Sequence, residues 1–121
     1  MSARNPTDML PLPYLAHLIL LALAEGDAHG WALIKRIRSL TAGRSNPSSG
    51  SLYLAIARLQ ASGLLEGRAA PAEESDTRRR YYRLLPFGRQ VLLAETSRLA
   101  GLVERARDLR VEDEAPGASH A

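Results

Sequence analysis

Apolar residues recur at helical spacing in three consecutive segments of the first half of the chain. The first, residues 12–24, is apolar around most of its circumference, so we expect it to be covered on several sides. The second, residues 30–41, and the third, residues 48–62, each place an apolar stripe opposite polar or basic positions. These stripes consist of Trp31, Ile34, Ile37 and Leu40 in the second segment and of Leu52, Ile56 and Leu59 in the third. The spacing predicts three helices packed around one core.

Residues 46–51 carry the turn and capping chemistry expected at the start of the third helix. A serine in this run can accept hydrogen bonds from the free N–H groups of a new helix, and Ser62 with Gly63 is a typical helix end. The exposed face of this helix is rich in hydroxyl groups and uncharged at its front end. Because such a front can lie close to a negatively charged partner, we interpret residues 48–62 as a recognition helix.

After the third helix the spacing changes from helical to alternating. Residues 64–68 and 78–84 each have the pattern of a short strand, with Tyr82 and Leu84 on one face of the second. Residues 69–77 are polar and join the two strands as a loop. Three helices followed by a β-hairpin constitute a winged helix-turn-helix, so the predicted fold class is mainly α with a small β-hairpin.

One long C-terminal helix is predicted over residues 86–110. Its apolar positions keep alternating steps of three and four residues, with a single gap at Glu95 and Thr96. A narrow stripe of this kind is typical of helices that pair with a partner helix, although a helix packed on its own domain would give a similar one. A helix of about 25 residues outreaches a domain this small, so we expect a dimer interface. Its predicted residues are Leu15 and Ile19 from the first helix and Leu92, Leu99, Leu102, Ala106 and Leu109 from the last.

The patterns together predict a domain order for the 121 residues, of which 45% are hydrophobic, enough for one modest core. The last segment is acidic and contains proline and glycine, which disfavours a packed structure. The predicted order is a flexible N-terminal lead over 1–11, a winged helix-turn-helix over 12–85, a dimerisation helix over 86–110 and a disordered tail over 111–121.

Composition excludes several classes of function. The chain has no cysteine, and its histidines, His17, His29 and His120, are scattered; we therefore expect no metal and interpret His17 as structural. No phosphate-binding glycine loop or metalloprotease motif is present, so we expect neither an enzyme nor a cofactor. The longest apolar run, residues 18–24, is far shorter than the roughly 20 residues of a membrane span. We expect a cytoplasmic protein.

Charge is unevenly distributed along the chain. The net charge is +3, but residues 1–89 carry twelve cationic and seven acidic side chains, whereas residues 90–121 carry four and six. The positive charge therefore lies in the part that contains the recognition helix, as a nucleic-acid surface requires. A solvated basic surface would give the same imbalance, so charge alone does not decide between the two.

A DNA-binding surface is favoured because separate features converge on it. The N-terminus of the recognition helix suits a phosphate, short hydroxyl side chains can contact phosphates or bases, and three consecutive arginines lie in the predicted wing. An arginine triplet is usually solvated surface, but its place beside a serine-capped helix favours phosphate contact. The predicted DNA-contacting residues are Ser48, Ser49, Ser51, Tyr53, Leu54, Arg58, Arg78, Arg79, Arg80 and Tyr81.

These motifs resemble those of the PadR family of bacterial transcriptional regulators, in its short form with a single C-terminal helix. The resemblance covers residues 10–110 and rests on four motifs: Ala28-His29-Gly30-Trp31, Pro47-Ser48-Ser49-Gly50-Ser51-Leu52-Tyr53, Gly63-Leu64 and Arg80-Tyr81-Tyr82-Arg83-Leu84. It implies a homodimer in which the C-terminal helices cross over and pack against the first helices. It also implies repression at a palindromic operator in double-stranded DNA, with release by a small aromatic or drug-like effector. The family's DNA contacts map onto Ser49, Ser51 and Tyr53 and onto Arg78 to Arg80.

The chain departs from the family pattern at three positions. Trp31 replaces the usual tyrosine and is expected to pack in the core, Leu54 stands where proline is common, and Leu85 replaces the threonine cap of the last helix. Two other readings stay open: a winged-helix adaptor that binds proteins and has no operator, and a small-molecule-binding protein without a role in transcription. The cationic wing and the polar third helix argue against the adaptor.

Overall fold

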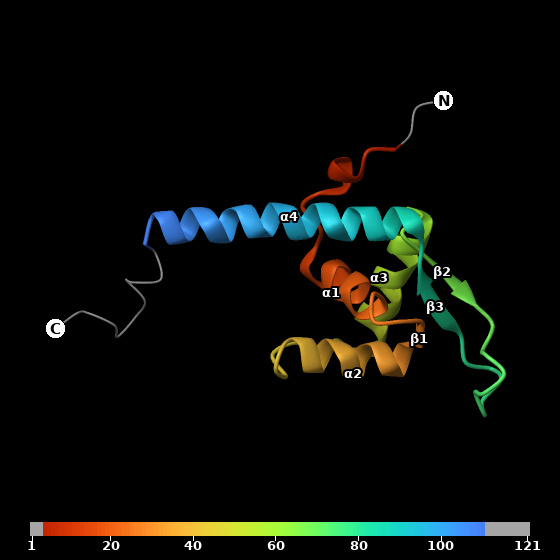
Figure 1. Cartoon of the computed structure of the whole chain (residues 1–121). Coiled ribbons are helices and arrows are strands. Elements are labelled where there is room, and N and C mark those ends of the chain that lie inside the picture. Colours follow the sequence, from red (N-terminus) through yellow and green to blue (C-terminus); the bar gives the residue numbers. More distant parts are fainter. Residues whose placement is uncertain (1–3, 111–121) are drawn as a thin grey trace.

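The computed structural model describes residues 4–110, so the predicted disordered tail over residues 111–121 lies outside the described residues. Figure 1 shows a long C-terminal helix that runs over a bundle of shorter helices, with a strand pair projecting at one end. The elements in chain order are the 3₁₀ helix η1 (Pro6–Met9), α1 (Tyr14–Leu23), β1 (Ala28–His29), α2 (Gly30–Leu40), α3 (Ser49–Ala61), β2 (Leu65–Arg68), β3 (Tyr81–Leu84) and α4 (Pro86–Asp108). This order agrees with the predicted winged helix-turn-helix and its C-terminal helix.

The core is built around α1, which is buried on nearly all sides as its apolar circumference predicted. Ile19 and Leu20 are fully buried, and so are Leu33 from α2 and Leu52 from α3. Burying a side chain of this size contributes about 1.5–3 kcal/mol, so these contacts fix how the three helices pack. The position of α3, and of the residues on its exposed face, follows from that packing.

The sheet has three strands rather than the two that were predicted. β1 pairs antiparallel with β3, which also pairs with β2, giving the order β1-β3-β2. The sequence predicts only a break between helices at β1, because a segment of two residues has no periodicity to detect. Its pairing joins the start of α2 to the base of the wing.

The second wing strand begins at Tyr81 and not at Arg78. A turn precedes it: the Asp76 carboxylate accepts a hydrogen bond from the Arg78 backbone N–H at 3.0 Å, and the Asp76 carbonyl accepts one from the Arg79 N–H at 3.1 Å. The arginine triplet therefore lies in the loop, where strand alternation does not govern the direction of its side chains.

Residues 4–11 are a packed part of the fold, whereas a flexible lead was predicted. Asn5 caps η1 by accepting a hydrogen bond from the Thr7 N–H at 3.0 Å. The Arg4 guanidinium lies 4.1 Å from the centre of the Phe87 ring of α4. In Figure 1 the segment crosses α4 on the side away from α1. This contact cannot be predicted from local sequence patterns, because Arg4 and Phe87 are far apart along the chain.

The predicted dimer stripe divides into two parts. Leu92 and Ile19 belong to the core of the protomer, with exposed fractions of 6% and 0%, so they are not available to a second subunit. In contrast Leu102 and Leu109 are more than half exposed, and the end of α4 that carries them extends beyond the helical bundle in Figure 1. The sequence pattern predicts one continuous stripe, because the buried and the exposed apolar residues of the helix follow the same helical spacing.

Trp31 is 58% exposed, although it was predicted to be a core residue, and Leu40 of the same predicted stripe is 43% exposed. The buried face of α2 is instead formed by Leu33, Ile34 and Ile37. Trp31 stands at the first turn of α2, next to the β1 pairing, and its side chain faces away from the core. This places an exposed aromatic ring beside the wing.

Candidate nucleic-acid interface

Helix α3 begins as the sequence predicted, with Ser48 as its N-cap. The Ser48 Oγ accepts a hydrogen bond from the Ser51 N–H at 3.1 Å and lies 3.1 Å from the Ser51 hydroxyl. Ser49 and Ser51 are exposed on the first turn. The free backbone N–H groups of that turn form the positive end of the helix dipole, and the two hydroxyl groups beside them can donate hydrogen bonds to a phosphate.

The exposed face of α3 has two edges with different surroundings. Tyr53 faces the wing, and a side chain added at Gly30 would collide with its hydroxyl group. Leu54 and Arg58 instead line a groove of about 350 Å³ on the other edge, together with Leu12 and Leu15. The structure therefore separates the predicted contact residues of α3 into a wing side and a groove side.

A pocket of about 330 Å³ lies where the wing loop meets α2 and α3. It brings the arginine triplet next to Tyr53 and includes residues that were not predicted to contact DNA. Its lining residues are His29, Gly30, Trp31, Tyr53, Arg78, Arg79, Arg80 and Tyr82. The only sequence feature that pointed to this surface is that Trp31 directly follows Gly30, the first residue of α2. The helical spacing of Trp31 instead predicted a core position.

Arg79 contacts His29 of β1 and two carboxylates of the wing loop, Glu74 and Asp76, with its Nε 4.0 Å from Oδ2 of Asp76. Its Nη1 lies 2.8 Å from Nε2 of His29 and 3.4 Å from Oε1 of Glu74. The same Glu74 oxygen accepts a hydrogen bond from the Tyr81 hydroxyl at 2.8 Å, and the Tyr81 ring packs edge-on against the His29 ring with centroids 5.3 Å apart. Tyr81 was predicted to contact DNA, and its hydroxyl is engaged with Glu74 inside the wing.

The charges of this cluster are set by these contacts. The hydrogen bond from Tyr81 lowers the pKa of Glu74 below its usual range, and the same bond raises the pKa of Tyr81. Burial, and after it the charge of Arg79, lower the pKa of His29. The cluster at neutral pH therefore contains an anionic Glu74, a neutral His29 and a cationic Arg79.

The other two arginines of the triplet differ in how they are paired. Arg78 is largely exposed, with its Nε 3.3 Å from an oxygen of Asp76. Arg80 packs its side chain near Gly67 of β2, and it forms no ion pair within residues 4–110. A phosphate can bind Arg80 without displacing a carboxylate.

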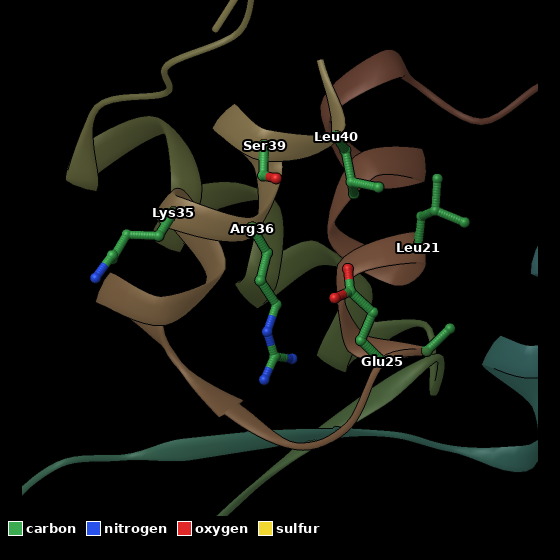
Figure 2. Close-up of a pocket in the computed structure, with 7 residues that line it drawn as sticks. Leu21, Glu25, Lys35, Arg36, Ser39 and Leu40 are labelled. Atoms are coloured by element: carbon green, nitrogen blue, oxygen red, sulfur yellow. The ribbon is translucent and has the colours of Figure 1, made fainter. Parts of the chain in front are cut away.

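A third surface hollow, of about 660 Å³, lies between the end of α1 and α2, and it shares no lining residue with the wing pocket. Figure 2 shows Arg36 extending from α2 toward the segment that leaves α1. Its Nη1 donates hydrogen bonds to the carbonyls of Ala22 at 3.1 Å and Gly26 at 2.7 Å. Arg36 therefore ties α1 to α2 and holds the turn before β1 in place.

Two properties of the described residues bear on the predicted partners. None of the helices in the described part of the chain is both long and apolar enough to cross a membrane. Residues 4–110 also contain no group of three or more His, Cys, Asp or Glu side chains arranged to hold a metal ion.

Comparison with known proteins identifies the family. Residues 19–94 match the model of the transcriptional regulator PadR-like family. The chain belongs to this family. The PadR-like family consists of transcriptional regulators and not of enzymes, which confirms both the resemblance and the prediction of a non-catalytic protein.

One relative of this PadR-like protein is an uncharacterized 37.1 kDa protein from a transposon of Streptomyces fradiae, 40% identical over 97 residues. The match covers 80% of this chain and 26% of the relative, so the chain spans about a quarter of the length of that protein.

Solved structures show the same fold. A transcriptional regulator from Clostridium thermocellum is 29% identical with a TM-score of 0.66, over 78% of this chain and 87% of that one. A PadR family transcription regulator from Clostridium difficile is 24% identical with a TM-score of 0.69, over 80% and 98% of the two chains. A PadR-like regulator from Bacillus cereus is 22% identical with a TM-score of 0.69, over 84% and 95%. The predicted winged helix-turn-helix with a C-terminal helix is confirmed by this likeness.

Proposed function

We propose that this PadR-like protein is a cytoplasmic homodimer that binds a palindromic operator in double-stranded DNA and represses transcription. The observation that carries the proposal is the wing pocket, where the arginine triplet lies beside the exposed face of α3. In the complex, α3 enters the major groove, with Ser49, Ser51 and Tyr53 directed at bases or phosphates. The wing arginines bind the phosphate backbone next to it.

The exposed end of α4 supports the homodimer. Leu102, Val103 and Leu109 are each about half exposed or more, and Leu99 and Ala106 lie on the same side of the helix as Leu102 by helical spacing. Exposed apolar side chains at this density mark a surface that another chain covers. Pairing of two such helices would give a dimer with two α3 helices, one for each half of a palindrome.

The groove between the N-terminal segment, α1 and α3 supports the proposal of a small aromatic or drug-like effector. Its lining is mostly apolar and includes Leu12, Leu15, Leu54 and Ala55, with Arg58 as the single charged side chain. Such a pocket with a few polar groups is the usual form of a small-molecule site. Because two of its walls are α1 and α3, a bound molecule would act directly on the position of α3.

The deciding experiment is selection of bound fragments from random DNA by the purified protein at two salt concentrations. A repressor is expected to enrich a palindrome whose half-sites are about 34 Å apart, one turn of the double helix. Binding without any enriched sequence would contradict operator recognition, and absence of binding at both salt concentrations would contradict DNA binding itself.

A further inference from the structure

Glu74 is a nearly buried carboxylate in the wing loop, beside the arginine triplet. Its side chain is 10% exposed. It accepts hydrogen bonds from three donors: the Tyr81 hydroxyl at 2.8 Å, the Asp76 N–H at 3.2 Å and the Arg79 Nη1 at 3.4 Å. A negative charge at this place lowers the attraction of the surface for DNA. Its overall effect on binding therefore depends on what it does to Arg79.

We propose that Glu74 is a positioning residue for Arg79, which it holds at the pocket between the wing and α3 so that Arg79 meets one operator phosphate in a fixed geometry. The inference rests on the proposed DNA binding and adds a residue to it that does not touch DNA. Phosphate contacts fix the register of a protein on its site, so a fixed Arg79 contributes to recognition of the operator more than to binding of random DNA.

The anchor of Glu74 is the sheet itself. Oε1 is held by the hydroxyl of Tyr81, which lies in β3 and pairs with His29 of β1. Without this contact, a long and flexible arginine side chain in a loop would sample many rotamers. Fixing one of them on DNA binding would cost conformational entropy. Because Oε1 is fixed by a strand residue, its contact with Arg79 restricts the guanidinium before DNA arrives.

The contacts to Arg79 also leave part of the guanidinium available. Both Glu74 and His29 approach Nη1, and no residue in the described range 4–110 hydrogen-bonds to Nη2. A guanidinium has donors that point in several directions. Nη2 can therefore bind a phosphate oxygen while Nη1 stays on its protein partners.

His29 cannot hold Arg79 by itself. Its Nδ1 accepts a hydrogen bond from the Ala32 N–H at 3.2 Å, which caps α2, while Nε2 faces a donor of Arg79. A neutral imidazole offers one lone pair, so it can serve only one of these two donors at a time. The carboxylate of Glu74 has no such conflict, because it can accept hydrogen bonds from Arg79, Tyr81 and the Asp76 N–H at the same time.

The test compares Glu74→Gln with Glu73→Gln on the selected operator and on random DNA of equal length. Both variants remove one negative charge from the same loop, but Glu73 is exposed and forms no hydrogen bond or ion pair within residues 4–110. Removal of charge alone should tighten binding to both DNAs, and we expect this for Glu73→Gln. For Glu74→Gln we expect tighter binding to random DNA but operator binding weakened about fivefold or more, as for loss of a charge-assisted hydrogen bond.

A double-mutant cycle with Arg79→Ala separates positioning from general damage to the wing. If Glu74 acts through Arg79, Glu74→Gln should not weaken operator binding further in a protein that already carries Arg79→Ala. Tyr81→Phe is a second variant, which releases the anchor of Oε1 without changing the charge, and it should weaken operator binding in the same direction. Thermal unfolding of every variant confirms that it is folded.

The outcomes are distinct. Tighter operator binding by both Glu73→Gln and Glu74→Gln, or an equal loss with and without Arg79, would overturn the positioning role while leaving DNA binding intact. Absence of DNA binding by the unmodified protein would overturn the proposed function, and the inference with it.

Discussion

Glu95 of α4 accepts a hydrogen bond on Oε2 from the backbone N–H of Leu12, at 2.8 Å, across 83 positions of the chain. The carboxylate is 2% exposed and is paired with Arg98, whose Nη2 lies 3.2 Å from the same oxygen. The bond attaches the entry to α1 to the middle of α4. The orientation of the long helix relative to the DNA-facing domain depends on this contact.

Replacing Glu95 is expected to destabilise the fold. Glu95→Ala leaves the buried Leu12 N–H without its acceptor, a loss of about 1–3 kcal/mol in the free energy of unfolding. Glu95→Gln keeps an oxygen for this N–H and should cost less. Urea unfolding at neutral pH measures both, and equal stability of Glu95→Ala and the unmodified protein would contradict the role of this bond.

Because Glu95 is ionised in the folded protein, we expect its contribution to stability to be lost at acidic pH. The hydrogen bond from Arg98 lowers the pKa of Glu95 below its ordinary value, against the opposing effect of burial. A folded-state pKa lower than the unfolded one gives stability that is present above the unfolded pKa and is lost as pH falls through the folded pKa. The stability difference between the unmodified protein and Glu95→Gln should therefore shrink as the pH is lowered below that of ordinary carboxyl titration. A difference that stays constant with pH would contradict an ionised Glu95.

Arg80 is expected to bind phosphate with the fewest rearrangements, since it forms no ion pair within residues 4–110. Arg80→Ala should weaken binding to operator and random DNA alike and lower the slope of log affinity against log salt by about 1. Arg89→Ala, which removes a charge on α4 outside the wing pocket, is the matched control. If fluorescence anisotropy shows the same slope of log affinity against log salt for Arg80→Ala and the unmodified protein, Arg80 does not contact a phosphate.

Leu102 is expected to lie in the dimer interface. Leu102→Glu places a charge in the exposed stripe of α4 and should give a monomer, because an unpaired charge is costly in an apolar interface. Leu93 is equally exposed, at 60%, but nine positions earlier it lies on the opposite side of the helix. Leu93→Glu should leave the dimer intact in sedimentation experiments, and a monomeric unmodified protein at micromolar concentration would contradict the dimer.

The exposed position of Trp31 can be tested by mutation. A core tryptophan replaced by alanine typically costs about 3–5 kcal/mol, whereas the exposed Trp31 should cost less than about 1 kcal/mol on Trp31→Ala. DNA binding should weaken, because the ring lines the wing pocket. A large loss of stability for Trp31→Ala in thermal unfolding would indicate that Trp31 packs in the core.

The helices could be predicted because their evidence is local. The serine cap at Ser48, the Leu52–Ile56–Leu59 stripe and the proline at the start of α4 each depend on neighbours within one or two turns. The parts of the fold that were not predicted depend on distant partners: β1 exists only through its pairing with β3, and Arg4 of the N-terminal segment packs on Phe87 of α4. Leu92 and Leu102 both belong to the apolar stripe that was predicted for the last helix, but the rest of the domain buries only Leu92.

The sequence by itself determined the helix-helix-helix-wing order, the capped and uncharged start of α3, and the presence of three arginines near it. Only the tertiary structure decided which side chains share the pocket, because that depends on how α2 and the wing are joined through β1. It added Trp31 to the surface, turned the Tyr81 hydroxyl inward and placed Glu74 against Arg79. Periodicity records which face of an element is apolar, whereas these contacts arise between elements whose relative positions are set by the packing of the whole core.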